Sequence, residues 1–195
     1  EEADRDYQMA AGISQDVEAD DSIWELTKAR LPWLLLALGG SFIAVNVSQS
    51  FSDAMEKYKI LFFFTPLIAA MAGNVGVQSS AIIVQGLANN SLTGSLWKRL
   101  MKEMLLSLFN STILAVILLF GTHFLMNTSY ELSFTIGTAL VIVMIIASLI
   151  GTFIPILLDK YGIDPALATG PFITTSNDIF GIFIYFTIAR IILGF

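Results

Sequence analysis

Five long stretches of this sequence carry no lysine, arginine, aspartate or glutamate, except for one carboxylate in the last of them. They cover residues 31–52, 60–97, 104–130, 132–158 and 165–189. A helix needs about 20 mostly apolar residues to cross the hydrocarbon core of a bilayer, and each stretch is long enough. The second ends in the polar, glycine-containing run "GLANNSLTGSLW", so it is interpreted as one span followed by a loop.

The sequence therefore predicts an all-α integral membrane protein with five transmembrane helices. The runs are continuously apolar rather than alternating, which argues against a β-barrel. The expected spans are roughly 31–52, 60–86, 104–127, 132–158 and 165–193.

Composition supports this class and excludes several kinds of site. Only 13% of the residues are charged, against about 25% in a typical soluble domain. The chain has no cysteine, which excludes disulfides and thiolate metal sites. Its single histidine, His123, excludes a zinc site with several histidines in one chain. No basic patch indicates nucleic-acid binding.

The net charge of −6 comes from the N-terminal segment, because residues 1–25 hold nine acidic residues and one basic residue. Residues 1–30 are expected to form a cytoplasmic acidic connecting helix, and Ser22 or Asp21 is a suitable N-cap with Glu25 as its capping-box partner. The loops at the N-terminal side of the spans carry six basic residues and those at the other side three, so the positive-inside rule places the N-terminus in the cytoplasm. The six are Lys28, Arg30, Lys98, Arg99, Lys102 and Lys160.

The second span differs from an ordinary apolar span. Its sequence, "TPLIAAMAGNVGVQSSAIIVQGLA", is rich in small residues, which let helices approach closely. Asn74, Gln78 and Gln85 lie on one helix face. Two interpretations are open: tight helix packing with amides bonded across helices, or the lining of a pore.

The fifth span contains the buried carboxylate. Pro171, Thr174, Asp178, Gly181 and Tyr185 recur at spacings of three and four and share one face. Counted from residue 165, Asp178 would lie about 20 Å into the span. A carboxylate at that depth costs at least ~2.5 kcal/mol, so it needs a protein or water partner. It is either a protonated, hydrogen-bonded structural group or an ion or proton site.

The ligands that these two spans offer are hard oxygens. They comprise one carboxylate, the amides of Asn74 and Gln78, hydroxyl groups and backbone carbonyls, which suit Mg²⁺, Ca²⁺ or Mn²⁺ better than soft metals. One carboxylate cannot build a full cage, whereas Mg²⁺ usually keeps several waters. Two chains on a two-fold axis would place two Asp178 groups around one pore.

Three segments, "RLPWLLLALGGSFIA", "PLIAAMAGNVGVQSSAIIVQGLA" and "GIDPALATGPFITTSNDIFGIFIYF", resemble the MgtE family of bacterial magnesium channels. The resemblance implies a homodimer in the inner (plasma) membrane, with five spans per subunit and a pore between the subunits lined by spans two and five. It implies that hydrated Mg²⁺, the transported ion, is held by Asp178 with the carbonyl of Thr174. The Gly-Asn element that the family has in its second span falls on Gly73 and Asn74, with Gly76 and Gln78 after it.

Two positions depart from the family pattern. Val77 stands where the family often has a second asparagine, and Gln85 where it often has arginine. Both bear on selectivity and rate more than on the basic function. Family members also carry cytosolic regulatory domains, including a CBS pair, which this sequence does not contain, and residues 1–30 match the segment that joins sensor to pore.

Three classes of function are weighed. The first is a Mg²⁺ channel, and the second is a cation exchanger coupled to Na⁺ or H⁺ with Asp178 as the carrier. The third, an intramembrane enzyme, is disfavoured because the sequence has no HExxH motif, no Gly-x-Ser-x-Gly motif and no Ser/His pair in one span. We expect no enzymatic activity.

Overall fold

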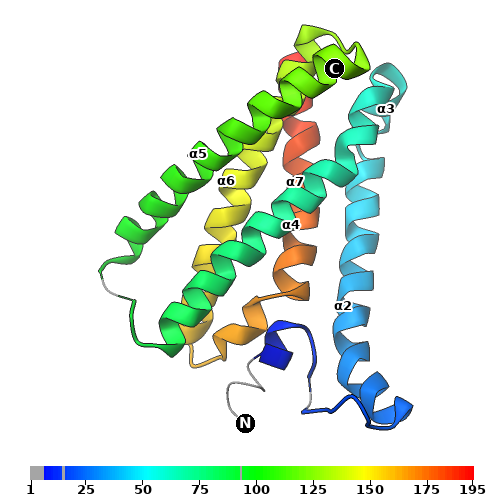
Figure 1. The fold of residues 1–195 in the computed structure, drawn as a ribbon. Helices are drawn as coiled ribbons and strands as arrows, with labels where there is room; N and C mark the ends of the chain where they lie inside the picture. The colour runs from blue at the N-terminus through cyan, green and yellow to red at the C-terminus, as the bar shows by residue number, and fades with distance from the viewer. Residues whose placement is uncertain (1–6, 15, 93) are drawn as a thin grey trace.

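The structure is a computed structural model that describes residues 7–14, 16–92 and 94–195, and these residues contain helices and no strands (Figure 1). A short helical turn at residues 7–10 precedes the main elements. The long α-helices are α2 (Ile23–Gln49), α4 (Lys59–Ala88), α5 (Leu96–Phe120), α6 (Tyr130–Lys160) and α7 (Pro171–Leu193). The short elements are α3 (Ser52–Lys57), the π-helical turn η1 (Gly121–Leu125) that continues α5, and the 3-10 turn η2 (Pro165–Ala168).

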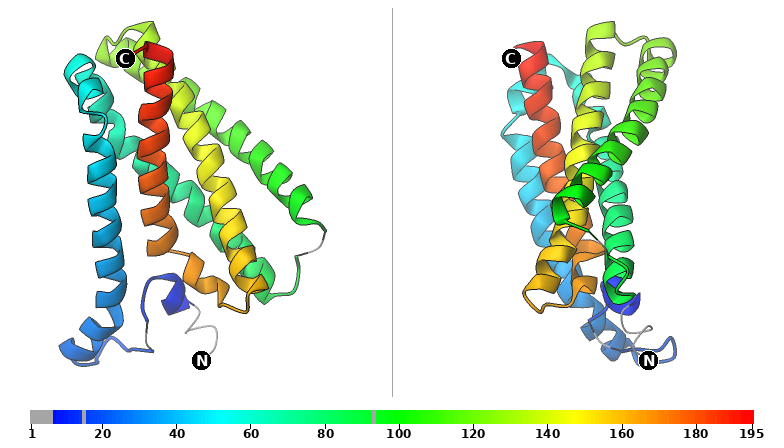
Figure 2. Two further views of the ribbon diagram at one scale, coloured as in Figure 1. Left: turned by 180° about the vertical axis from the view of Figure 1, so that it is seen from behind. Right: turned by 90° about the vertical axis from the view of Figure 1, so that its left-hand side faces the viewer.

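Five of these helices, α2, α4, α5 with η1, α6 and α7, are long and apolar enough to cross a membrane, which confirms the all-α, five-span prediction. They run alternately up and down, so that the N-terminal turn, η2 and the loop after α4 lie at one end (Figures 1 and 2). Helices α4, α6 and α7 pack against one another, α5 lies against α6, and α2 packs on α7.

Helix α2 begins earlier than the charge-free stretch because its N-terminus is capped. The hydroxyl of Ser22 accepts a hydrogen bond from the backbone of Glu25, and the carboxylate of Glu25 accepts one from the backbone of Ser22. The described part of residues 1–30 is thus not one helix, since residues 11–14 and 16–22 are irregular and Gly12 has a φ of 81°. Residues 1–6, part of the expected acidic helix, lie outside the described residues.

The last span is shorter than the sequence suggested. Gly170 adopts a φ of 55°, and Pro171 then starts α7 at its first position, where its missing N–H has no helical partner to lose. The chain before it, Pro165–Ala168, is a separate 3-10 turn. Asp178 is therefore the eighth residue of α7, about 10 Å from its start rather than the 20 Å counted from residue 165.

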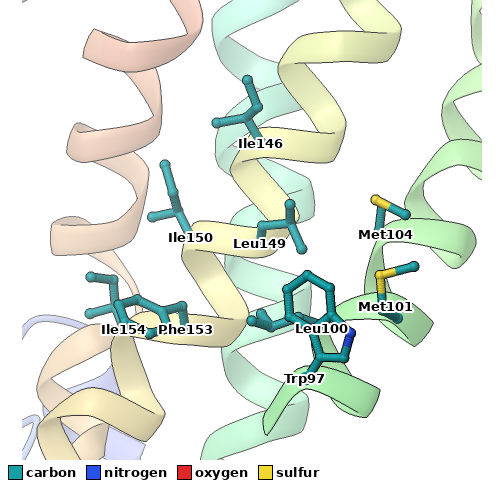
Figure 3. Close-up of a pocket in the computed structure, with 9 residues that line it drawn as sticks. All are labelled: Trp97, Leu100, Met101, Met104, Ile146, Leu149, Ile150, Phe153 and Ile154. Carbon is teal, nitrogen blue, oxygen red and sulfur yellow. The ribbon is translucent and has the colours of Figure 1, made fainter.

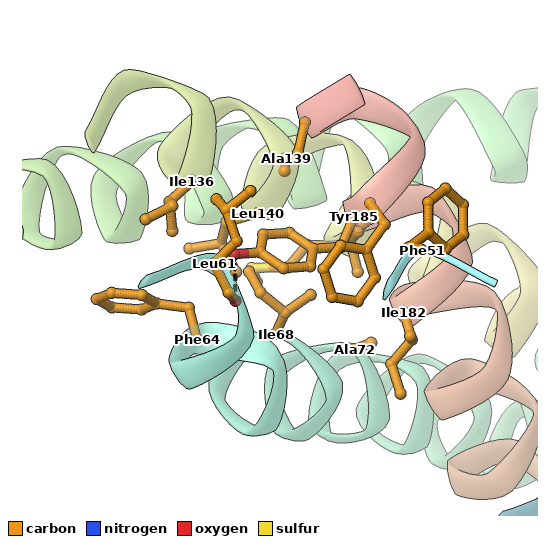
Figure 4. Packing of buried hydrophobic residues seen from close by; sticks show 14 of the residues in the cluster. Phe51, Leu61, Phe64, Ile68, Ala72, Ile136, Ala139, Leu140, Ile182 and Tyr185 are labelled. Atoms are coloured by element: carbon orange, nitrogen blue, oxygen red, sulfur yellow. Dashed lines mark hydrogen bonds between the residues drawn. The ribbon is translucent and has the colours of Figure 1, made fainter. Parts of the chain in front are cut away.

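The apolar core lies in the half of the bundle that contains the C-terminus (Figure 4). Leu61 and Ile68 of α4, Ile136 of α6 and Phe186 of α7 are fully buried there. Tyr185 joins them, and its hydroxyl donates a hydrogen bond of 2.8 Å to the carbonyl of Leu61. This bond satisfies the polar atom of a completely buried ring and fixes α7 against α4.

In the other half of the bundle, small residues replace this core and bring the three central helices together. A Cβ atom added to Gly151 of α6 would overlap the backbone carbonyl of Gly76 on α4. On the α7 side, a Cβ on Gly76 would overlap the amide of Asn177. The backbones of α4 and α6 therefore touch directly, a contact that is typical of helix pairs within membranes.

This contact predicts that Gly151→Ala is strongly destabilising. The added methyl meets a backbone atom that cannot move aside, so we expect a loss of about 1–3 kcal/mol. Gly39→Ala is the matched control, because a Cβ there meets nothing within 4 Å. The measurement is the free energy of unfolding in mixed detergent micelles. Equal effects of the two substitutions would contradict the close contact.

Candidate ion site between α4 and α7

A cavity of about 480 Å³ lies between the middle of α4 and the first half of α7. Seven of its lining residues come from α4 and two from α7. They are Pro66, Ala69, Ala70, Gly73, Asn74, Val77, Gln78, Thr174 and Asp178. The α4 contribution is mostly small or apolar, and the polar groups are confined to two short faces that look into the same space.

Each helix contributes one pair of polar residues, spaced by one turn. Asn74 and Gln78 are exposed on α4, with Asn74 at the middle of that 30-residue helix. Thr174 and Asp178 are half-buried on α7. Spacing by four residues puts both members of each pair on one helix face. The arrangement brings one carboxylate and two amides to one cavity within the span.

Gly73 allows the carboxylate to approach α4. A Cβ atom at this position would lie 3.3 Å from Cγ2 of Thr174 and 3.7 Å from Oδ1 of Asp178. A larger side chain would push α7 away or fill the cavity. The hydroxyl of Thr174 donates a 3.0 Å hydrogen bond to the carbonyl of Gly170, so it is committed to its own helix. The backbone carbonyl of Thr174 keeps a second lone pair for another donor.

Within the described part of the chain, no hydrogen-bond donor or cation pairs with Asp178. The carboxylate faces the cavity instead of a protein partner. The described residues also include no group of three or more His, Cys, Asp or Glu side chains able to hold a metal ion.

The structure brings five of the six expected site residues to this cavity. Asp178, Thr174, Gly73, Asn74 and Gln78 all line it. Gly76, three residues after Gly73, does not. It is buried in the contact between α4, α6 and α7 described above.

Of the two positions that depart from the family pattern, one lines the cavity and the other does not. Val77 lines the cavity, and Gln85 is exposed on α4 outside it. The apolar side chain of Val77 therefore takes up part of the cavity wall where the family often has a polar one.

Asn177 is a polar residue of the site region that the sequence did not single out. It is 1% exposed, and neither its amide oxygen nor its nitrogen has a hydrogen-bond partner among the described residues. Leaving a buried polar group unpaired costs about 1–3 kcal/mol. The available signal in the sequence was its position directly before Asp178, as a second polar residue within an apolar span.

Glu103 of α5 is a second polar group that the sequence did not place. Its carboxylate accepts a 2.6 Å hydrogen bond from the hydroxyl of Ser79 on α4, one residue after Gln78. Ser79 is also 2.9 Å from the carbonyl of Val75 in its own helix. The half-buried carboxylate of Glu103 therefore binds α4 on a different face from the one that lines the cavity.

Comparison with known proteins supplies the family. The family model described as MgtE, divalent cation transporter, matches residues 65–188, which include every residue that lines the cavity. The chain belongs to the MgtE family. The match confirms the resemblance drawn from the motifs of spans two and five.

Individual relatives agree with the family match. The MgtE family member named magnesium transporter MgtE in Bacillus subtilis is 35% identical over 96% of this chain and 42% of its own length. The protein of the same name in Enterococcus faecalis is 33% identical over 100% of the chain and 43% of its own length. The protein of the same name in Thermus thermophilus is 31% identical over 85% of this chain and 36% of its own length. The chain thus spans less than half the length of these relatives.

The Ser79–Glu103 bond predicts a measurable energetic coupling between α4 and α5. Ser79→Ala and Glu103→Ala should each lower the free energy of unfolding, and the double variant should lose about 1–2 kcal/mol less than the sum. A cycle of Gln85→Ala with Glu103→Ala is the control, because Gln85 is exposed on α4. If the Ser79 cycle is as additive as the control cycle, the bond contributes nothing.

Proposed function

We propose that this chain forms the membrane pore of a channel that conducts hydrated Mg²⁺. The observation that carries the proposal is the cavity between α4 and α7, where one carboxylate and two amides from two candidate spans line the same space. Membership of a family described as divalent cation transporters, and relatives named magnesium transporters, support the identity of the ion.

The chemistry of the lining favours a hydrated ion over a dehydrated one. Mg²⁺ gives up its waters reluctantly and is usually bound through one or two carboxylates. Asp178 supplies the charge, while Asn74 and Gln78 supply neutral oxygens that accept hydrogen bonds from bound water. The backbone carbonyl of Thr174, one helical turn before Asp178, would add a further oxygen to this set. The groups suit the outer surface of a hydrated ion.

A homodimer would complete the pore. The cavity has lining on α4 and α7 of one chain, with Asn74 and Gln78 exposed on it. A second copy related by a two-fold axis would present the same face and add a second Asp178. Two carboxylates would balance the charge of one divalent cation. The pore would then lie between subunits, lined by α4 and α7 of each.

The proposal predicts that Asp178 controls ion flux. In proteoliposomes with an inside-negative potential and no Na⁺ or H⁺ gradient, Asp178→Asn and Asp178→Ala should each lower Mg²⁺ uptake at least about ten-fold, the factor that corresponds to ~1.4 kcal/mol. Asp159→Asn makes the same chemical change at an exposed position at the end of α6, and should leave uptake unchanged.

Two outcomes would count against the proposal. Full uptake by both Asp178 variants would show that the carboxylate is not the ion site. Uptake by the unchanged chain that requires an opposing Na⁺ or H⁺ gradient would favour the exchanger instead, with Asp178 as the carrier.

The dimeric pore predicts cross-linking between subunits through α4. The chain has no cysteine, so Asn74→Cys introduces one thiol per subunit. Because Asn74 would face its counterpart across the pore, a short bis-maleimide should join two subunits in the bilayer. Phe109→Cys, exposed on α5, is the control and should stay uncross-linked. Cross-linking of the control alone would place the subunit interface on α5.

A further inference from the structure

A second polar cavity, of about 330 Å³, lies where the loop after α4 meets the first turns of α5. It shares no residue with the cavity between α4 and α7. Every described residue in its lining is basic, a serine or a glycine. They are Ser91, Gly94, Ser95, Lys98, Arg99 and Lys102. We call this cavity the basic pocket.

The basic side chains share one face of α5. Lys98 and Lys102 are four residues apart, so they lie one above the other on the helix, with Arg99 beside them. The apolar residues Trp97 and Met101 lie on a different face, where they line a separate cavity against α6 (Figure 3). The basic pocket is therefore formed by α5 and the preceding loop, without α6.

The two lysines of the pocket are not neutralised within the described part of the chain. Neither Lys98 nor Lys102 pairs there with a carboxylate. The acidic residue closest to them in the sequence is Glu103, and its carboxylate accepts a 2.6 Å hydrogen bond from Ser79 of α4. Like charges four residues apart on a helix repel each other. A bound anion would replace this repulsion with attraction.

The loop side of the pocket is held in place by contacts within the protein. The N–H of Ser91 donates a 3.0 Å hydrogen bond to the carbonyl of Gly86 at the end of α4. Leu92 packs on the same glycine, where a Cβ atom would overlap its side chain. The hydroxyl of Ser95 accepts a hydrogen bond from the N–H of Lys98 and so caps α5. The proton of that hydroxyl remains available to a ligand.

The lining suits an anion that carries several oxygens and more than one charge. A phosphate monoester has a charge of about −1.5 to −2 at pH 7 and three strongly accepting oxygens. Lysine binds phosphate as a point charge, and a serine hydroxyl adds a directed donor. A single carboxylate would bring only one charge to three basic side chains. Cations such as Mg²⁺ are repelled from this pocket.

We propose that the basic pocket binds a phosphate group, with Lys98 and Lys102 at its oxygens and the hydroxyl of Ser95 as a further donor. Two sources carry this chemistry. One is the headgroup of an anionic phospholipid, because the pocket lies where two candidate spans end. The other is a soluble phosphate compound. The site goes beyond the proposed ion conduction and does not rest on it.

The test measures how a ligand protects a thiol placed in the pocket. The chain has no cysteine, so Ser91→Cys introduces a single thiol into the lining. The protein is held in phosphatidylcholine nanodiscs and labelled with a small uncharged maleimide. We expect pyrophosphate to halve the labelling rate at a concentration on the order of 1 mM or below. Potassium chloride of equal ionic strength should not protect the thiol.

A lipid arm of the same experiment separates the two sources. Phosphatidic acid, whose headgroup is a phosphate monoester, replaces part of the phosphatidylcholine, and no pyrophosphate is added. Slower labelling with both probes would assign the pocket to phosphate groups of either source. Protection by phosphatidic acid alone would assign it to lipid headgroups, and protection by pyrophosphate alone to soluble compounds. Ser52→Cys, exposed at the opposite end of the bundle, is the reporter control and should respond to neither probe.

Two pairs of substitutions test the role of the lysines. In the Ser91→Cys background, Lys98→Gln with Lys102→Gln should raise the protecting concentration by roughly five-fold for each lysine. Lys57→Gln with Lys59→Gln makes the same change in exposed lysines at the opposite end of the bundle and should leave it unchanged.

Three results would overturn the proposal. Labelling that neither pyrophosphate nor phosphatidic acid slows would show that the pocket holds no phosphate. Equal protection by potassium chloride, or equal effects of the two double-lysine variants, would show only a general effect of charge. Full protection that persists without Lys98 and Lys102 would place the phosphate elsewhere.

Discussion

The direct contact between the backbones of Gly76 and Gly151 decides how the central helices are arranged. Lipid tails are as apolar as leucine, so helices in a bilayer gain little from burying apolar surface and depend on close packing. This contact lets α4 cross α6 closely, and Asn177 of α7 fits against the same glycine. Three residues earlier, Gly73 admits Thr174 and Asp178. The glycines therefore set the distance between the amides of α4 and the carboxylate of α7.

The polar site depends on the rest of the bundle for its stability. Two groups that a membrane protein normally avoids occupy adjacent positions on α7: the amide of Asn177, which has no partner among the described residues, and the ionisable side chain of Asp178. The core in the other half of the helices offsets their cost, and the Tyr185–Leu61 bond fixes α7 there. A polar site inside a membrane must keep its groups from moving to other partners. The tightly packed apolar half of the same helices provides that rigidity.

The sequence predicted the features that depend on composition and on helical period. Charge-free length gave five spans, and spacings of four gave the pairs Asn74–Gln78 and Thr174–Asp178. It could not separate Gly73 from Gly76, because both lie near one face of α4 and their roles depend on where α6 crosses. Nor could it find the bond between Ser79 and Glu103, which joins residues 24 positions apart. The start of α7 was missed because a 3-10 turn and a glycine with positive φ interrupt an apolar run that has no charge to mark the break.

Each chain contributes one carboxylate to the lining of the cavity between α4 and α7, and this constrains how the proposed pore can work. A divalent cation held by a complete cage of carboxylates would bind tightly and leave slowly, whereas conduction requires binding that is favourable but weak enough to release the ion. In the proposed pore, Asp178 would provide charge without a cage, and Asn74 and Gln78 would provide oxygens for the water bound to the ion. In a dimer, two such carboxylates would neutralise the ion while its hydration shell keeps them at a distance. In that proposed pore, the small residues of α4 would leave space for the ion together with its water.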